Sequence, residues 1–142
     1  MLVLTDRRDH CFYFHEQFPG VSGLYMGGMK EKDLEASKGK TLVIGTFQQA
    51  HEGLDIETLD TVFLATPKSN IEQSVGRILR GKARNAPVIY DICDAWSLFN
   101  AMYYNRAKVY RASGFKIEGG PKEKEKKEKR KREEDVGFLI RM

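Results

Sequence analysis

The sequence of 142 residues contains little cysteine and no long apolar run. Cys11 and Cys93 lie far apart without a Cys-x-x-Cys spacing. A tetrahedral zinc site needs four ligands, so we expect two buried thiols in a reducing compartment. No apolar stretch approaches the ~20 residues that cross a bilayer. Charge begins at Asp6, too early for the apolar part of a signal peptide, and these absences favour a soluble, intracellular protein.

A complete phosphate-binding loop is also missing. Residues 39–41, Gly-Lys-Thr, have the ending of such a loop, but its first glycine would have to stand at position 34, which is Leu34. The loop further needs a strand before it and a helix after it. Here a charged helix is predicted before residues 39–41 and an apolar strand after them. We therefore interpret these three residues as a turn that enters a strand.

What the sequence does contain is enough apolar residues, 41%, for the core of about one domain. Short apolar runs alternate with amphipathic segments. Strands are predicted at residues 2–5, 21–26, 41–46, 61–66 and 88–92. Helices are predicted between the first strand and residue 18, and at residues 30–37, 70–80 and 95–111. Strands rich in Val, Ile and Leu between helices favour an α/β fold with a mainly parallel sheet and helices on both faces.

The charge of the chain is concentrated beyond residue 118. Net charge is +4, and residues 122–135 contain eight basic and six acidic side chains. This run has no apolar face, so residues 119–142 are predicted to form a helical or disordered tail, separate from a domain at residues 1–118. Residues 129–132 could be a nuclear import signal or a phosphate-binding patch. A solubilising tail is favoured, because acidic residues flank that patch.

Two polar segments follow predicted strands. Residues 45–56, GTFQQAHEGLDI, are predicted as a loop after the third strand, and residues 73–80, QSVGRILR, as part of the helix after the fourth. Ligands of open parallel sheets bind at the carboxyl ends of strands. Arg77 and Arg80 share one helical face, and Gly76 permits close approach just before them. Two convergent guanidiniums suit a phosphoryl group, although such pairs alone are usually a solvated helix face.

Together and in this order the segments resemble a known family. Residues 2–8, LVLTDRR, resemble motif IV of superfamily 2 helicases, residues 45–56 motif V, and residues 73–80 motif VI. Residues 1–118 therefore look like the second RecA-like domain of these enzymes, a three-layer α/β/α sandwich. The phrases EGLDI, LATPKSNIEQSVGRILR and DICDAWSLF are similar to DEAD/DEAH-like helicases of large nucleocytoplasmic DNA viruses, which are related to XPB-like helicases.

The resemblance implies a role for each matching residue. Arg77 and Arg80 would be catalytic arginine fingers, supported by Gln73. The nucleotide would be contacted by Gly53, Asp55 and Gly76. The nucleic-acid backbone would be contacted by Thr46, Thr5 and Arg7. ATP and Mg²⁺ would be held mainly by an N-terminal lobe outside this sequence. DNA is the expected partner and RNA the alternative. A viral protein of this kind would work in the host cytoplasm, the nucleus or the virion.

The sequence also departs from the family. It has neither the Walker A phosphate loop nor the DExx carboxylate pair, and residues 133–135, Glu-Glu-Asp, follow a charge run rather than an apolar strand. The loop expected between Thr46 and Gly53 is longer than in many relatives. We therefore expect the C-terminal lobe of an ATP-dependent nucleic-acid helicase that is inactive by itself. The rival is a non-catalytic module that binds nucleic acid or a partner.

Two further groups of residues have an ordinary interpretation. Aromatic side chains near the end of the domain could stack on bases, but packing is favoured at their helical spacing: Tyr103, Tyr104, Tyr110 and Phe115. Asp91 and Asp94 could be metal ligands. Capping roles are favoured, because Asp91 lies at a strand end and Asp94 directly before a helix.

Overall fold

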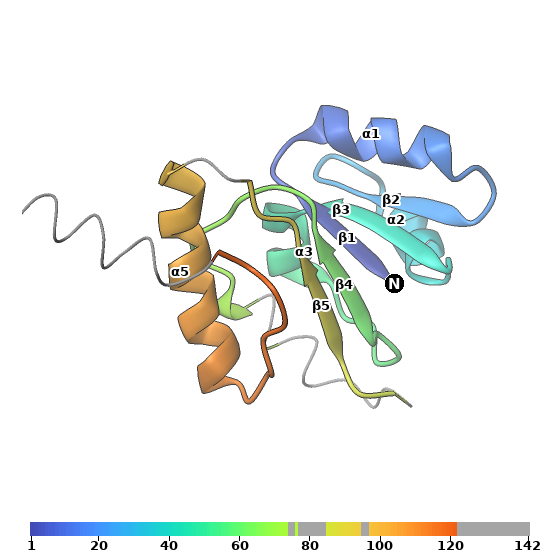
Figure 1. Cartoon of the computed structure of the whole chain (residues 1–142). Helices are drawn as coiled ribbons and strands as arrows, with labels where there is room; N and C mark the ends of the chain where they lie inside the picture. The colour runs from blue at the N-terminus through green and yellow to red at the C-terminus, as the bar shows by residue number, and fades with distance from the viewer. Residues whose placement is uncertain (74–75, 77–84, 95–96, 122–142) are drawn as a thin grey trace, which may run out of the picture.

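The computed structural model describes residues 1–73, 76, 85–94 and 97–121, which contain a five-stranded sheet whose paired strands are all parallel (Figure 1). The strands are β1 (Leu2–Thr5), β2 (Ser22–Tyr25), β3 (Leu42–Thr46), β4 (Thr61–Leu64) and β5 (Val88–Asp91). The helices are α1 (Arg8–Gln17), α2 (Glu31–Lys38), α3 (Phe47–Gly53) and α5 (Ser97–Ala112). The strand order is β2-β3-β1-β4-β5, and all five predicted strands are confirmed.

Helices cover the sheet on both faces. Cys11 of α1 is buried against Ile44 of β3 on one face. On the other face Leu34 of α2, Phe47 of α3 and Tyr110 of α5 share one core cluster with strand side chains. β3 lies between both layers, and this is why its residues 42–45 form a continuous buried run instead of an alternating one. The predicted three-layer α/β/α architecture is therefore confirmed.

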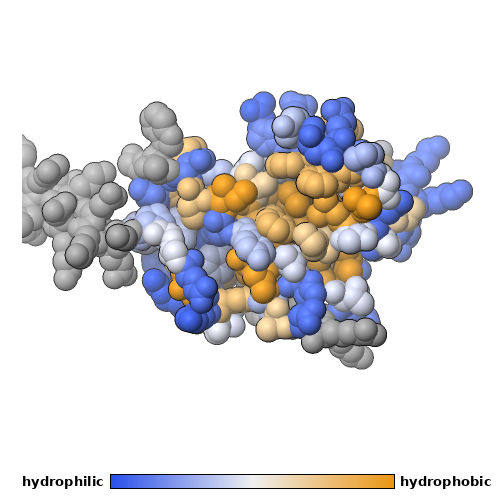
Figure 2. Space-filling view, turned by 45° about the vertical axis from the view of Figure 1, so that its right-hand side comes forward, coloured by the Kyte–Doolittle hydropathy of each residue, from blue (hydrophilic) through white to orange (hydrophobic). Residues whose placement is uncertain are grey.

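The sheet is not covered evenly. β5 is an edge strand, and Val88 and Tyr90 are 44% and 52% exposed, while the intervening Ile89 packs against the core. The ring of Tyr90 stacks on Phe63 of β4 at a centroid distance of 4.6 Å. In Figure 2 apolar residues gather in the middle of the face that is shown. The α1 side of β4 and β5 thus carries apolar side chains that no described helix covers.

The prediction of a loop at residues 45–56 is wrong for residues 47–53, because these form α3. Thr46 is the N-cap, and its hydroxyl accepts a hydrogen bond from the backbone N–H of Gln49 at 3.3 Å. Phe47 and Ala50, three positions apart, are both buried and fix the helix on the sheet. Gly53 is the last residue of this helix, so the long loop expected before it does not exist.

Other predictions have mixed outcomes. Residues 39–41 form the turn between α2 and β3, as predicted. Of the helix predicted at residues 70–80, Glu72, Gln73 and Gly76 are helical, whereas Arg77 and Arg80 lie outside the described residues. The tail from residue 122 also lies outside them, so the boundary predicted at residue 118 stays a prediction. No helix in the described ranges is long and apolar enough to span a membrane.

Candidate functional site

The carboxyl ends of the strands bring the polar segments together. β1 and β3 are direct neighbours, and their register pairs Thr5 with Thr46. β4 lies on the other side of β1, with Leu4 paired to Leu64. Segments that are about forty and sixty residues apart in sequence are therefore adjacent at one edge of the sheet. In an open parallel sheet this is the edge at which ligands bind.

Thr46 is half-buried at this edge. Its hydroxyl oxygen accepts from the N–H of Gln49, which leaves the hydroxyl hydrogen free to donate. The capping role that Thr46 would have on its own is thus observed. Because a capped hydroxyl can still donate, this bond is compatible with a contact to a phosphate oxygen.

Thr5 does not reach the surface. Its exposed fraction is 0%, and its hydroxyl contacts Nδ1 of His10 at 3.2 Å and accepts from the N–H of Arg7 at 3.4 Å. The direct phosphate contact expected for Thr5 is not supported, because a buried hydroxyl with two protein partners cannot meet a phosphate. Thr5 instead shapes the turn that presents Arg7. The Arg7 side chain is 69% exposed and has only a long, 4.0 Å pair with Asp9 among the described residues.

The turn after β1 is tied to the neighbouring loops. Arg8 donates to the backbone carbonyl of Gly27, beyond β2, at 2.7 Å. The N–H of Asp6 donates to Oγ1 of Thr66, beyond β4, at 2.9 Å. The Asp6 carboxylate pairs with Lys68 at 2.9 Å. These bonds hold the loops beyond β1, β2 and β4 in one arrangement, and the β4 loop leads into the helix that carries Gln73.

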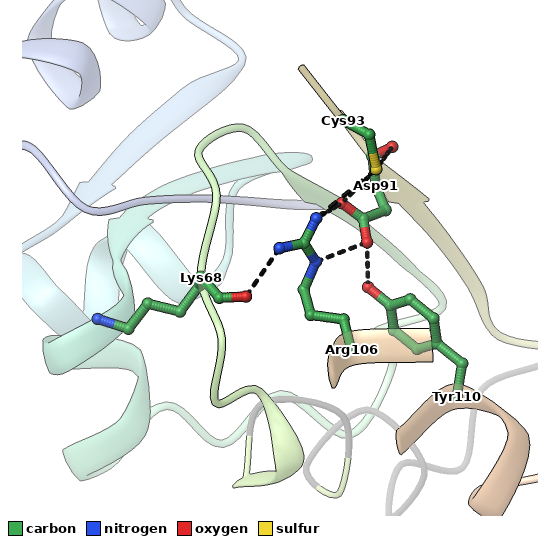
Figure 3. Close-up of polar contacts among 5 residues, drawn as sticks. All are labelled: Lys68, Asp91, Cys93, Arg106 and Tyr110. Atoms are coloured by element: carbon green, nitrogen blue, oxygen red, sulfur yellow. Dashed lines mark hydrogen bonds and ion pairs between the residues drawn. The ribbon is translucent and has the colours of Figure 1, made fainter. Parts of the chain in front are cut away.

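A buried ionic network supports the same loop from the other side (Figure 3). Arg106 of α5 is 1% exposed and donates from Nε and a terminal nitrogen to the Asp91 carboxylate at 2.7 and 2.9 Å. Its other terminal nitrogen donates to the carbonyl of Lys68 at 2.8 Å. Tyr110 donates its hydroxyl hydrogen to Asp91 at 2.7 Å. The capping role predicted for Asp91 is therefore wrong, because both its carboxylate oxygens are committed to α5.

The charges in this network are fixed by burial and by each other. Burial, followed by the bond to Asp91, raises the pKa of Tyr110, so its hydroxyl stays protonated. Burial opposes the charge of Arg106, but Asp91 outweighs this effect and the guanidinium pKa is raised. Burial and then the Asp91 charge raise the pKa of Cys93 to about 11. The network is thus an ion pair with two neutral donors.

The structure also bears on the predictions for the aromatic side chains and for the two cysteines. Tyr103 and Tyr110 are 6% and 5% exposed, which confirms packing instead of base stacking for these two rings. Cys11 is fully buried, and burial raises its thiol pKa to about 11, while Cys93 is only half-buried. Both cysteines are free thiols. Neither is placed or activated as a nucleophile.

The residues expected at the nucleotide lie on two elements. Gly53 ends α3 and Asp55 follows it, exposed, while the intervening Leu54 is 5% exposed and anchors the segment in the core. Gln73 is exposed at the start of its helix. A Cβ added to Gly76 would meet none of the described residues within 4 Å. The structure thus leaves Asp55 and Gln73 accessible to a ligand.

The fit to Mg²⁺ and ATP can be tested on the donors present. In the described ranges no group of three His, Cys, Asp or Glu side chains could hold a metal ion. Asp55 is exposed and could accept from a ribose hydroxyl, but a single carboxylate is not a magnesium site. The described residues therefore offer one exposed carboxylate to a ribose and no cluster of ligands to a metal ion.

Sequence reasoning missed Lys68, Arg106 and the helix α3. The Thr46 cap and the spacing of Phe47 and Ala50 could have revealed α3. Nothing in the local sequence marks Lys68 or Arg106, because their roles depend on contacts 62 and 15 residues away.

Comparisons with known proteins agree with the fold and with the motifs. No protein-family model matches the chain. A protein of Acanthamoeba polyphaga mimivirus named "Putative ATP-dependent RNA helicase" is 50% identical over 76 residues, which are 53% of this chain and 15% of that protein. A protein of African swine fever virus, also named as an ATP-dependent RNA helicase, is 26% identical over 97 residues, 66% of this chain and 19% of the relative. The chain thus spans less than a fifth of the length of these relatives.

Solved structures show the same fold. The E. coli DEAD-box protein SrmB, bound to regulator of ribonuclease activity A, has a TM-score of 0.61 at 15% identity and covers 87% of this chain and 75% of its own. The yeast DEAD-box splicing factor Prp28 has a TM-score of 0.56 at 16% identity, covering 85% of this chain and 32% of its own. Fold and sequence relatives together confirm that the chain resembles the C-terminal RecA-like domain of superfamily 2 helicases and that its sequence relatives are viral.

Proposed function

We propose that this chain is the C-terminal lobe of an ATP-driven helicase or translocase acting on single-stranded nucleic acid. ATP would bind between this lobe and an N-terminal lobe, and closure of the two would assemble the catalytic groups. The observation that carries the proposal is the pairing of Thr5 with Thr46, which places the motif IV and motif V segments side by side at the ligand-binding edge of the sheet.

Nucleic acid would be held through its backbone. Arg7 presents an exposed guanidinium beyond β1, and Thr46 presents a hydroxyl hydrogen beyond the adjacent β3. Both groups suit phosphate oxygens, and such contacts position a strand without reading its sequence.

Residues of the motif V and motif VI segments would contact ATP. Asp55 would accept from a ribose hydroxyl, with Gly53 and Gly76 beside the nucleotide and Gln73 bonding near the triphosphate. Arg77 and Arg80 would act as arginine fingers, which are worth ~10³–10⁵ in rate where they have been measured. The bonds that join Lys68 to Asp6 and Arg106 would position the loop that leads to Gln73.

The choice between DNA and RNA is part of the proposal. The sequence favoured DNA, whereas the printed names of the viral relatives contain RNA helicase. Phosphate contacts from Arg7 and Thr46 do not distinguish the two, because only a contact to the 2′-hydroxyl would. We therefore propose RNA as a substrate at least as good as DNA, on the strength of the relatives.

A reconstitution experiment tests the function. The chain is mixed with a separately produced N-terminal lobe of a related viral helicase, and phosphate release from ATP is measured with single-stranded RNA or DNA. We expect turnover only when both lobes and nucleic acid are present. Binding of nucleic acid without any stimulated turnover would replace the proposal by its rival, a non-catalytic binding module.

A further inference from the structure

Among the described residues, no strand pairs with the outer edge of β5, which lies beside a large groove. β5 pairs with β4 on one side only, where the N–H groups of Val88 and Ile92 donate to carbonyls of the β4 strand and its approach. Because N–H groups alternate in direction along a strand, those of Ile89 and Asp91 point toward the open side. An unpaired edge of this kind is a template for one more strand.

The groove has the dimensions and chemistry for a polypeptide. It has a volume of about 1140 Å³ and lies between β5 and the segment that follows α5, with residues 86–91 on one wall and residues 113–121 on the other. Asn100 of α5 also lines it.

The chain leaves the described structure at this groove. Gly119 and Gly120 both have positive φ, and a Cβ added to Gly120 would collide with the ring and hydroxyl of Tyr103. Only glycine allows this close approach, so the exit of the chain is fixed. Pro121, the last described residue, itself lines the groove.

A segment suited to the groove follows in the sequence. Residues 122–135 are charged throughout, and residues 136–142 read Val-Gly-Phe-Leu-Ile-Arg-Met. In an extended conformation Val136, Phe138, Ile140 and Met142 would share one face, while Gly137, Leu139 and Arg141 would share the other. An apolar row with period two is typical of a half-buried strand.

The linker is long enough for the return. Fourteen residues at ~3.3 Å each reach about 46 Å when extended, and about 21 Å if helical, whereas a four-residue strand such as β5 is only about 13 Å long. A linker that turns back on itself can therefore bring residues 136–142 to the edge of β5.

We propose that residues 136–142 of this chain add to the open edge of β5 as a sixth strand. The apolar row would continue the exposed row of Val88, Tyr90 and Ile92 on the α1 side of the sheet, where cross-strand neighbours lie ~5 Å apart. The added strand would accept hydrogen bonds from the N–H groups of Ile89 and Asp91. The charged linker keeps the segment soluble before it docks. This inference does not depend on the proposed function.

Amide hydrogen exchange of the full chain tests the proposal. The N–H groups of Ile89 and Asp91 should exchange about tenfold or more slowly in the wild type than in a Phe138→Asp, Ile140→Asp variant, which places two charges in the apolar row. Lys127→Gln with Lys129→Gln is the matched control, since it lowers the net charge by the same two units within the linker and should keep the protection. Val62, in the centre of the sheet, reports that every variant is folded.

The outcome decides between occupants. Protection that is independent of protein concentration and lost only in the Phe138, Ile140 variant supports the intrachain strand. Equal exchange in the wild type and that variant would overturn it. Protection that rises with concentration, together with dimers in sedimentation, would also overturn it and assign the edge to a second copy of the chain.

Discussion

Thr46 has a structural role as a helix cap and a proposed role in binding nucleic acid. Its hydroxyl oxygen caps α3 through Gln49, and its hydrogen is proposed to donate to a phosphate. Replacement by Ala would remove both and cost about 0.5–2 kcal/mol of stability through the lost cap alone. A variant that retains the cap is needed to test the ligand contact.

Thr46→Asn and Thr46→Asp form such a pair, because Asn and Asp are both good N-caps. The free energy of unfolding of both variants should lie within about 0.5 kcal/mol of the wild-type value. Asp adds a negative charge at the proposed phosphate position, so nucleic-acid affinity should fall about tenfold, while Asn should change it little. Fluorescence anisotropy with labelled single-stranded RNA measures this. Equal affinity of the two variants would remove Thr46 from the interface.

Tyr110 adds a second donor from α5 to the Asp91 carboxylate that is paired with Arg106. Tyr110→Phe removes a donor to a carboxylate that is almost fully enclosed, and we expect a loss of about 1–3 kcal/mol of unfolding free energy. Chemical denaturation measures the change. Tyr13→Phe, at a position 60% exposed, is the control and should change stability by less than about 0.5 kcal/mol.

The same residue predicts a pH dependence. The folded state holds the phenol proton more tightly than the unfolded chain, whose value is near 10.0, because burial and the bond to Asp91 raise the pKa of Tyr110. Its contribution is therefore complete below pH 10 and is lost as pH rises above it. The stability of the wild type should decline more steeply above pH 10 than that of Tyr110→Phe. Parallel declines would mean that the phenol is not the group responsible.

At the scale of elements, the strands could be predicted and one helix could not. The five strands are short Val-, Ile- and Leu-rich runs, since they are buried by the sheet and its helices. α3 is short, polar on its outer side and ends in Gly53, so its sequence is that of a loop until Phe47 and Ala50 are recognised as one buried face.

The candidate site, like the fold, could be predicted from the sequence only in part. The motif segments and their meeting at one edge follow from the alternation of strands and helices. The burial of Thr5 and the pairing of Asp91 with Arg106 depend on tertiary contacts, which local patterns do not contain. Lys68 belongs with them, because it was identified only from its bonds to the β1 turn and to α5.

The helix that begins before Gln73 carries the sharpest test of the enzymatic proposal. In the reconstituted pair of lobes, Arg77→Ala or Arg80→Ala should lower the rate of ATP hydrolysis strongly and weaken ATP binding only modestly, because charge on the transferring phosphoryl group is best met by donors fixed in advance. Lys should rescue poorly at either position, since it lacks the planar fork of Arg. Wild-type turnover in both single Ala variants would show that neither is a finger.

At the scale of the whole molecule, the proposed function makes the described structure one half of a two-lobe arrangement. Its ligand-binding edge offers an exposed guanidinium, a hydroxyl and a lone carboxylate, but no described group that could hold Mg²⁺. In that proposal the lobe closes on a nucleotide held by the other lobe. It would also contact nucleic acid by itself, since Arg7 and Thr46 both belong to this chain.

The isolated chain should therefore bind single-stranded nucleic acid weakly and not hydrolyse ATP. Because binding is through phosphates, affinity should fall steeply with salt and depend little on sequence. Arg7→Ala removes one proposed contact and should reduce the slope of log affinity against log salt by ~0.7 for a single strand. Its stability should hardly change, because the side chain is exposed and its Asp9 pair is 4.0 Å long.

The charged tail is the competing source of any such binding, since residues 122–135 contain eight basic side chains. Replacing these residues by a Gly/Ser linker of equal length keeps residues 136–142 in place and removes only the charge. If the folded lobe is the interface, the changed chain retains sequence-independent binding and Arg7→Ala still lowers the salt slope in it. Complete loss of binding in the linker variant would assign the affinity to the tail and remove Arg7 and Thr46 from the nucleic-acid interface. Phosphate release above a protein-free control, measured in the same samples with saturating RNA, would contradict the need for a second lobe.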